Sequence, residues 1–453
     1  MDIRGKNVLV LGLGISGVST AKALYKLGAN IIISDLKKEE ELIDYVSEIR
    51  DLNVRFFLGT NDVPLEYIDL IIKSPGIPLT VDLIKEANRR GIEVISDIEL
   101  AYRINPDNNF IAITGTNGKT TTTALTGEFF KNGDLPTHVV GNIGVGILWN
   151  IVNSDNEDIF VIEASSFQLE STVYFNPKVS VILNITPDHL DWHKDLEAYI
   201  DAKKKIFRNQ TKDEYTILNY DDKLLRNMEK EVASNLIWFS RQYELPKGVY
   251  VKDGYIVIND GNSVKALIKT DEIKLLGKHN LENVLASVSI AWIMGLDMDT
   301  MKYVLKTFSG VEHRIEYVDT VNGIKFYNDS KGTNPDASIK AIEALKSPII
   351  LIAGGHDKGN EFDEFILSFN NKVKALILLG ETKYKIKNTA IKYGFNNIYI
   401  VDNMKEAVIK SYELAKTGDN VLLSPACASW DMYRSFEERG KDFKKAVHSL
   451  REE

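Results

Sequence analysis

The chain has 453 residues, of which 44% are hydrophobic and 26% charged, the balance of a soluble globular protein with room for about three domains. Its net charge of −9 disfavours a nucleic-acid-binding protein, because such proteins usually present a basic face to phosphates. A single cysteine, Cys427, excludes an internal disulfide, and no apolar run approaches the about 18 residues of a membrane span, so we expect a cytoplasmic protein without membrane insertion.

The first 95 residues alternate short apolar runs with helical patterns. Strands are expected at 7–11, 30–34, 69–73 and 92–95, and helices around 16–27, 37–51 and 80–90. Such alternation is typical of a parallel sheet covered by helices. We therefore predict a Rossmann-like α/β domain over residues 1–95.

A glycine-rich turn follows the first of these strands. Gly12, Gly14 and Gly17 are spaced as G-x-G-x-x-G at the start of a helix, and Asp35 ends the next strand. This pattern indicates a diphosphate-containing nucleotide better than it indicates NAD, although a turn that needs glycine only for packing has the same spacing. Ser74 follows the third strand, either near the nucleotide or in a simple turn.

The rest of the chain predicts two further α/β blocks. In residues 96–309, strands are expected at 110–114, 159–163, 179–184 and 215–219, with a β-hairpin insert at 248–276 and a helix after it. In residues 310–453, strands are expected at 324–328, 348–353, 374–379, 397–401 and 420–424. We predict a central P-loop ATPase-like domain with a mostly parallel sheet, followed by a second Rossmann-like domain.

A phosphate loop is the strongest motif in the chain. It follows the strand at 110–114 and comprises Gly115, Thr116, Asn117, Gly118, Lys119, Thr120 and Thr121. Backbone N–H groups of such a loop cradle phosphates, the lysine neutralises the terminal ones, and the hydroxyl of Thr120 can ligate Mg²⁺. The loop departs from the usual G-x-x-x-x-G-K-[ST] pattern, because Ile113 stands where that pattern has glycine.

Two further residues are candidates for the metal site. Glu163 ends a strand, where α/β enzymes place functional groups, and with Thr120 it supplies oxygen ligands suited to Mg²⁺. Glu163 could instead cap a helix or pair with Lys119. His189 follows the strand at 179–184; it could equally be a capping or surface residue, because histidine is an unusual Mg²⁺ ligand.

Three loops of the last block carry cations. They lie at 312–314, 328–334 and 354–358 and contribute Arg314, Lys331 and Lys358. Clustered cations in an acidic protein indicate an anionic ligand such as a phosphate or carboxylate, unless the three loops are unrelated. No base is evident near Cys427, so we interpret it as a buried structural residue.

Taken together, these motifs resemble those of the Mur ligase family, which builds the peptide stem of bacterial peptidoglycan. The resemblance runs along essentially the whole chain and is carried by GLGISGVS, SPGI, TGTNGKTTTT, GNIG, EASSFQLE, TPDHLDWH, YIDAKKKIF, HRIE, NDSKGTN, GGHDKG and SPACASWDMYRSFEERG. The sequence has no DNPR-like motif of the relatives that add lysine or diaminopimelate. The resemblance implies an ATP-dependent acid–amino-acid ligase that joins UDP-N-acetylmuramoyl-L-alanine to D-glutamate through an acyl phosphate.

The resemblance also implies roles for individual residues. Positions that match the UDP-substrate site are Ile15, Ser16, Asp35, Leu36, Ser74, Asn142 and His189; at Leu36 the family often has a hydroxyl residue. Positions that match the ATP and Mg²⁺ sites are Lys119, Thr120, Glu163, Asn280, Asn283, Arg314 and Asp329, with His189 at a second Mg²⁺. Positions that match the D-glutamate pocket are Lys331, Thr333, Lys358, Ser429 and Phe436.

One lysine of the family is carbamylated by CO₂ and becomes a metal ligand. Lys203 matches it, but one residue is missing between His189 and Tyr199 relative to some members, so Lys204 stays an alternative. Two other classes of function are also open. A nucleotide-dependent dehydrogenase would explain the first glycine turn but not the phosphate loop, and a non-catalytic nucleotide-binding scaffold would not turn over. We expect a monomer.

Overall fold

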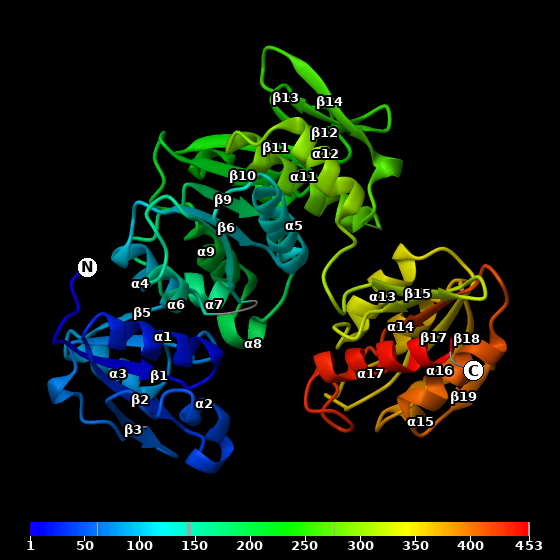
Figure 1. Ribbon diagram of the computed structural model, residues 1–453, viewed down its shortest axis with the longest axis horizontal. Helices are drawn as coiled ribbons and strands as arrows, with labels where there is room; N and C mark the ends of the chain where they lie inside the picture. Colours follow the sequence, from blue (N-terminus) through cyan, green and yellow to red (C-terminus); the bar gives the residue numbers. More distant parts are fainter. Residues whose placement is uncertain (61, 143–145, 276, 452–453) are drawn as a thin grey trace. The chain divides into compact units, whose positions relative to one another are not determined.

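The computed structural model describes residues 1–60, 62–142, 146–275 and 277–451, with the backbone alone at 190, 191, 278 and 279. It forms two compact units, one of Met1–Ile273 with Leu281–Lys306, the other of Lys274–Asn280 with Thr307–Glu453. The first contains a five-stranded and a nine-stranded sheet, the second a six-stranded sheet (Figure 1). The predicted α/β class with three mainly parallel sheets is thus confirmed, and 1–95, 96–309 and 310–453 remain our proposed domain limits.

The N-terminal sheet is fully parallel, with strand order β3-β2-β1-β4-β5. Its elements are β1 (Asn7–Leu11), α1 (Ile15–Lys26), β2 (Asn30–Asp35), α2 (Ile43–Ser47), β3 (Val54–Leu58), β4 (Leu70–Lys73), α3 (Asp82–Arg89) and β5 (Glu93–Ile95). Strand β3 was not predicted: as an edge strand it is half exposed, and Arg55 interrupts its apolar run. The helix expected over 37–51 is wrong, because only a 3₁₀ turn at Glu39–Glu41 and the short α2 form there.

The central sheet has the order β14-β13-β12-β11-β10-β9-β6-β8-β7. Its strands are β6 (Asn109–Thr114), β7 (Thr137–Gly141), β8 (Ile159–Glu163), β9 (Val179–Ile182), β10 (Tyr215–Asn219), β11 (Asn235–Ser240), β12 (Gly248–Lys252), β13 (Tyr255–Asn259) and β14 (Val264–Lys269). The pairing is parallel from β7 to β12, whereas β12, β13 and β14 are antiparallel. The hairpin insert therefore extends the sheet, as Figure 1 shows in green. Strands β7 and β11 were not predicted.

The helices of the central part are mostly short. They are α4 (Asp97–Ile104), α5 (Lys119–Asn132), α6 (Ile147–Ile151), α7 (Ser166–Leu169), α8 (Leu190–His193), α9 (Leu196–Lys204), α10 (Lys223–Asn227), α11 (Lys278–Ile293) and α12 (Met298–Thr307). Helix α5 packs on β6, β7 and β8. Among the residues that the structure describes, no helix has the length and apolar character needed to span a membrane.

One hydrophobic core joins the first two sheets. It includes Val8 and Ala21 from the N-terminal part and Phe110, Leu148 and Phe160 from the central part. Helix α6 packs on both α1 and α4. Because apolar burial is the main stabilising contribution to folding, a shared core holds these two sheets together as one body.

The C-terminal sheet has the order β15-β16-β20-β17-β18-β19, and only β15 runs antiparallel to its neighbour. Its strands are β15 (Glu316–Val321), β16 (Ile324–Asn328), β17 (Ile349–Ala353), β18 (Val373–Leu378), β19 (Ile398–Ile400) and β20 (Asn420–Leu423). One face is covered by α13 (Pro335–Ala344), α14 (Asp363–Leu367) and α15 (Lys383–Lys392), the other by α16 (Met404–Leu414) and α17 (Phe436–Ser449). Edge strand β15 was not predicted.

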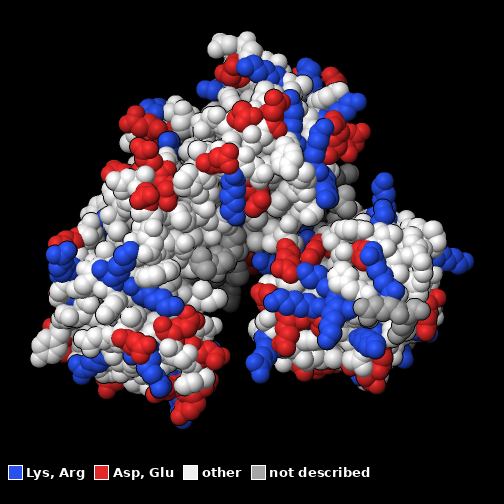
Figure 2. All heavy atoms as spheres, in the orientation of Figure 1, with Lys and Arg blue, Asp and Glu red and all other residues white. Residues whose placement is uncertain are grey.

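Acidic and basic side chains are interspersed over the face of the molecule shown in Figure 2. This distribution agrees with a net charge of −9 spread over 453 residues.

Candidate active site

The phosphate loop joins the end of β6 to the start of α5. Gly118 has a φ of +89°, and a Cβ there would lie 2.2 Å from Oδ1 of Asn283, so the loop needs glycine for both conformation and space. Nζ of Lys119 donates to the carbonyl oxygens of Gly115 (2.8 Å) and Thr116 (2.9 Å). The lysine therefore curls over its own loop, next to the N–H groups that open α5, which is the geometry of an anion site.

Glu163 ends β8 beside this loop and has the features of a metal ligand. Its side chain is buried, and Oε1 accepts a hydrogen bond from Nδ2 of Asn142 at 3.1 Å. Oε2 is buried without a hydrogen-bond partner among the described residues. A buried carboxylate oxygen left in this state is costly, and a cation would satisfy it. Glu163 does not cap a helix, because Ser165 is the N-cap of α7.

Lys203 and Lys204 occupy different environments. Lys203 is buried, and its Nζ donates to the carbonyl of Gly115 (3.0 Å) and approaches Oγ1 of Thr114 (3.3 Å). Burial and the charge of Lys119 lower the pKa of Lys203 well below its usual value. Lys204 points elsewhere and forms an ion pair with Glu231 at 2.8 Å. Of the two lysines, Lys203 is the one at the phosphate loop.

His189 lies at the start of α8 in the left-handed region, with a φ of 53°. Its ring packs on Phe167 at 4.9 Å, and its Nε2 lies 3.5 Å from Asp188. The exposed imidazole thus lies at the surface. Its role as a ligand of a second metal ion stays a prediction.

Two residues of this region were not predicted as site residues. Tyr199 is buried, its hydroxyl lies 3.2 Å from Oγ1 of Thr116, and the ammonium of Lys203 lies over its ring at 4.5 Å. His193 stands 3.0 Å from Oγ of Ser166, and its ring contacts that of Tyr199. The spacing of Tyr199 and Lys203, four residues apart on one helix, was the available signal.

The first glycine turn and the Ser74 turn lie together. Oγ of Ser74 donates to the carbonyl of Gly12 at 3.1 Å, and a Cβ on Gly12 would lie 2.7 Å from Oγ of Ser74. A Cβ on Gly17 would lie 2.3 Å from the same carbonyl, whereas one on Gly14 would face open space. Gly12 and Gly17 are therefore needed because a side chain would clash there, whereas Gly14 leaves room for a ligand to approach the backbone.

The remaining UDP-site candidates surround this turn. Oδ2 of Asp35 accepts the N–H of Leu13 at 2.8 Å, so this carboxylate fixes the turn. Oγ of Ser16 donates to Asp97 at 2.6 Å. Ile15 and Leu36 expose most of their apolar side chains. Of the GNIG motif only Gly141 and Asn142 are described; Ile143 and Gly144 lie outside the described residues.

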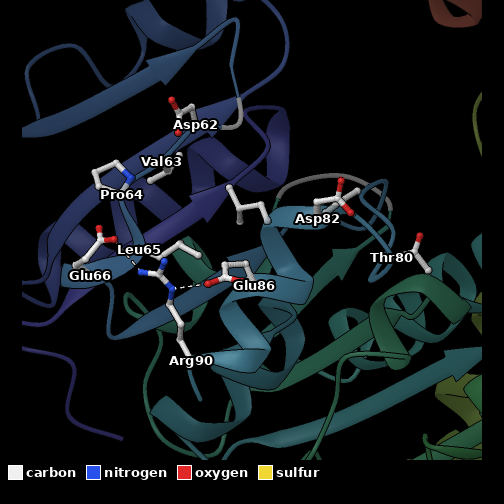
Figure 3. A pocket seen from close by; sticks show the side chains of 11 residues that line it. Asp62, Val63, Pro64, Leu65, Glu66, Thr80, Asp82, Glu86 and Arg90 are labelled. Carbon is white, nitrogen blue, oxygen red and sulfur yellow. Dashed lines mark hydrogen bonds and ion pairs between the residues drawn. The ribbon is translucent and has the colours of Figure 1, made fainter.

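A separate cavity of about 950 Å³ lies in the N-terminal part between α3 and the 62–66 segment (Figure 3). Arg90 at its base pairs with Glu66 at 2.9 Å and with Glu86 at 2.8 Å, as the dashed lines show. Because its arginine is already neutralised, the cavity is poorly suited to a diphosphate. None of the predicted site residues lines it.

In the C-terminal unit, Asp329 follows β16 and is buried. Its Oδ2 accepts from Oγ of Ser424 at 2.7 Å and its Oδ1 from the N–H of Ile315 at 3.3 Å. Burial raises the pKa of Asp329 to about 7. Arg314 lies just before this contact and, like Asp329, stays a proposed nucleotide residue.

Glu312, His313 and Glu316 come close enough together to suggest a metal site. Nζ of Lys444 lies between the two carboxylates, at 2.6 Å from Glu312 and 2.9 Å from Glu316. The ammonium of Lys444 bridges the two carboxylates and already occupies the place that a cation between them would take. We assign this cluster a structural role.

Arg439 on α17 connects the loops that carry the predicted acceptor residues. Its buried guanidinium donates to the carbonyls of Ser330 (2.8 Å), Cys427 (3.1 Å) and Ala428 (3.0 Å). Ala428 also accepts the N–H of His356 at 2.9 Å. The three loops at 330–333, 354–359 and 424–431 thus meet around one arginine, which sequence patterns did not single out.

Four of the five predicted acceptor residues lie on these loops, and the fifth, Phe436, is the first residue of α17. The ammonium of Lys331 lies 5.6 Å from the ring centre of Phe436. Ser429 is buried, and Thr333 is half-buried. Cys427 is buried as predicted, and burial raises the pKa of its thiol to about 11.

Comparison with known families agrees with this architecture. The MurD-like N-terminal domain of Mur ligases matches residues 6–96, the Mur ligase middle domain matches 113–291, and the glutamate ligase domain of Mur ligases matches 313–427. The chain belongs to the Mur ligase family. This result confirms the resemblance inferred from the motifs and favours a ligase over the dehydrogenase and scaffold alternatives.

Individual relatives narrow the comparison. The chain is 52% identical to a UDP-N-acetylmuramoylalanine–D-glutamate ligase of Thermoanaerobacter sp. (strain X514) and 48% identical to one of Clostridioides difficile (strain 630), over 100% of each chain. Among solved structures, it is similar to UDP-N-acetylmuramate–alanine ligase MurC from Thermotoga maritima (TM-score 0.62, 18% identity, 98% and 99% of the chains). MurF ligase from the same organism, in complex with ADP, gives 0.57 at 16% identity over 99% of each chain. These two structures support the fold.

Proposed function

We propose that this chain is an ATP-dependent ligase that adds D-glutamate to UDP-N-acetylmuramoyl-L-alanine in peptidoglycan precursor synthesis. The observation that carries the proposal is full-length identity of about half to ligases of that name, in a chain whose phosphate loop stands beside a buried carboxylate. We also propose a cytoplasmic monomer, in keeping with its single cysteine and its family.

The proposed chemistry is that of the family, and the charged groups of the phosphate loop are suited to it. The terminal carboxylate of the UDP substrate attacks the γ-phosphorus of ATP, the bond to ADP breaks, and an acyl phosphate forms. The D-glutamate amine then attacks the acyl carbon, and inorganic phosphate leaves as the amide forms. Lys119 and the N–H groups that open α5 offset the phosphate charge, so the protein acts by positioning and electrostatic stabilisation.

Mg²⁺ fits the residues present. Thr120 and Oε2 of Glu163 would hold the first ion, and when bound it neutralises phosphate charge that the protein alone does not. Asn142 fixes the orientation of Glu163 through Oε1. His189, together with a carbamylated Lys203, would hold a second ion.

Carbamylation is chemically reasonable at Lys203. Its lowered pKa leaves more of the amine uncharged, and an uncharged amine adds to CO₂ to give a carbamate and a proton. The product replaces a buried cation with an anionic oxygen ligand. Lys203→Met and the matched Lys204→Met test this: the first should abolish turnover, whereas the second should keep both turnover and its dependence on bicarbonate.

The decisive experiment is phosphate release with ATP, Mg²⁺ and UDP-N-acetylmuramoyl-L-alanine, with the amino acid varied. Release that depends on D-glutamate, but not on L-alanine, lysine or diaminopimelate, is expected. Release with another of these amino acids and none with D-glutamate would reassign the acceptor. No release with any of them, from protein that binds ATP, would refute a ligase.

A further inference from the structure

An exposed tryptophan stands over one of the acceptor-loop lysines. Trp430 is 64% exposed, which is unusual for so large an apolar side chain. The ammonium of Lys358 lies 4.8 Å from its ring centre, within cation–π distance. The ring of His356, from the same loop as the lysine, lies 5.8 Å away. The indole therefore packs along the loop at 354–359.

The titratable side chains of this loop have acidic or basic partners, with one exception. His356 pairs with Glu381 at 2.8 Å, and Asp357 pairs with Lys385 at 3.4 Å. No carboxylate among the described residues lies within ion-pair distance of Lys358. The π face of Trp430 thus orients this cation but does not neutralise it. A carboxylate partner would neutralise it.

The backbone fixes both members of this contact. The N–H of His356 donates to Ala428, and the N–H of Tyr433 donates to the carbonyl of Ser429 at 2.8 Å. Arg439 also donates to the carbonyl of Ala428, at 3.0 Å. Lys358 and Trp430 therefore sit on two loops whose spacing is set by hydrogen bonds rather than by the lysine itself.

We propose that Trp430 is a positioning residue for Lys358, and that it holds the ammonium ready for the side-chain carboxylate of the amino-acid substrate. This inference rests on the proposed function, because it presupposes an amino acid with a second carboxylate. A lysine already confined to one region loses less side-chain entropy when that carboxylate binds. Trp430 thereby contributes to selection of an acidic acceptor without touching the reacting atoms.

The test uses the full chain and compares Trp430→Leu, Trp430→Phe and Lys358→Met. Trp430→Leu should raise KM for D-glutamate about two- to fivefold, the change expected from loss of an exposed cation–π contact, with kcat and KM for ATP unchanged. Trp430→Phe should restore most of the loss. Tyr384→Leu is the matched control, because Tyr384 is 60% exposed and forms a similar contact with Lys383 at 5.7 Å; it should change nothing.

A double-mutant cycle separates this role from a structural one. In a Lys358→Met background, Trp430→Leu should have almost no further effect on KM, because the residue acts through the lysine. Preference for D-glutamate over D-glutamine should fall in both single variants. Three results would each overturn the inference: additive effects of the two substitutions, a fall in kcat together with a rise in KM for ATP, or an unchanged KM for D-glutamate in Trp430→Leu. Failure of the proposed function would show instead as wild-type protein that releases no phosphate with D-glutamate.

Discussion

The role of Arg439 can be tested by Arg439→Met, which keeps much of the side-chain volume and removes the donors. Three buried carbonyls, of Ser330, Cys427 and Ala428, would lose their guanidinium partner. An unsatisfied buried acceptor costs about 1–3 kcal/mol. Part of this is offset, because burial is unfavourable for the charge itself, as the lowering of the pKa of Arg439 to about 10 shows. We expect a net local loss of about 2–4 kcal/mol.

Hydrogen–deuterium exchange measures this loss where it occurs. Peptides that cover 351–358 and 424–435 contain the N–H groups of His356 and Tyr433, which close the loop junction. Their exchange should accelerate roughly 30- to 1,000-fold, the equivalent of about 2–4 kcal/mol, with little change in the N-terminal unit. Arg451→Met is the control, because the mostly exposed Arg451 pairs with Asp319 and not with the carbonyls of the loop junction. Unchanged exchange at the junction, or equal changes in both variants, would refute the reasoning.

Three further predictions concern single groups. Because the pKa of Asp329 is raised to about 7, the folded state holds the proton of this carboxyl more tightly than the unfolded state. Its contribution to the free energy of unfolding is complete below about pH 4 and is lost as pH rises through about 7, by up to about 4 kcal/mol. Urea unfolding of wild type and Asp329→Asn at pH 5 and 8 should show that the variant lacks this decrease, and parallel curves would contradict it. Glu163→Gln should raise the Mg²⁺ concentration for half-maximal phosphate release at least tenfold, because the amide is a poorer ligand for the ion proposed at Oε2; an unchanged Mg²⁺ titration would exclude that role. Gly118→Ala should raise KM for ATP about tenfold and leave KM for the UDP substrate unchanged, because its Cβ meets Asn283 in a left-handed conformation; equal changes in both would indicate global damage.

The features that the sequence predicted well are those determined locally. A phosphate loop needs only a buried strand, glycines at fixed positions and a helix start, so its place was evident from residues 110–121. Buried strands such as β8 and β20 are continuous apolar runs and were found for the same reason. Strand β3 was missed, because an edge strand with half-exposed residues carries little pattern.

The features that could not be predicted depend on contacts between distant segments. Lys203 and Lys204 are neighbours on α9, and only the packing of that helix decides which one faces Gly115. Arg439 lies 109 residues from Ser330 in sequence, so no local spacing connects them. In the sequence, Trp430 cannot be distinguished from other loop residues, because its contact with Lys358 forms only when two distant loops come together.

In each candidate site, one lysine has no carboxylate within ion-pair distance among the described residues: Lys203 is then open to reaction with CO₂, and Lys358 to an anionic ligand. Lys203 is held by a carbonyl and a hydroxyl and Lys358 by an aromatic face, whereas Lys204 and Lys385, on neighbouring surfaces, are paired with carboxylates. A carboxylate partner would have to be displaced before an anion could bind, or would compete with it throughout. A π face, as at Lys358, orients an ammonium and leaves its charge in place. A site lysine therefore differs from a surface lysine in the kind of partner that holds it: a carbonyl, a hydroxyl or an aromatic ring rather than a carboxylate.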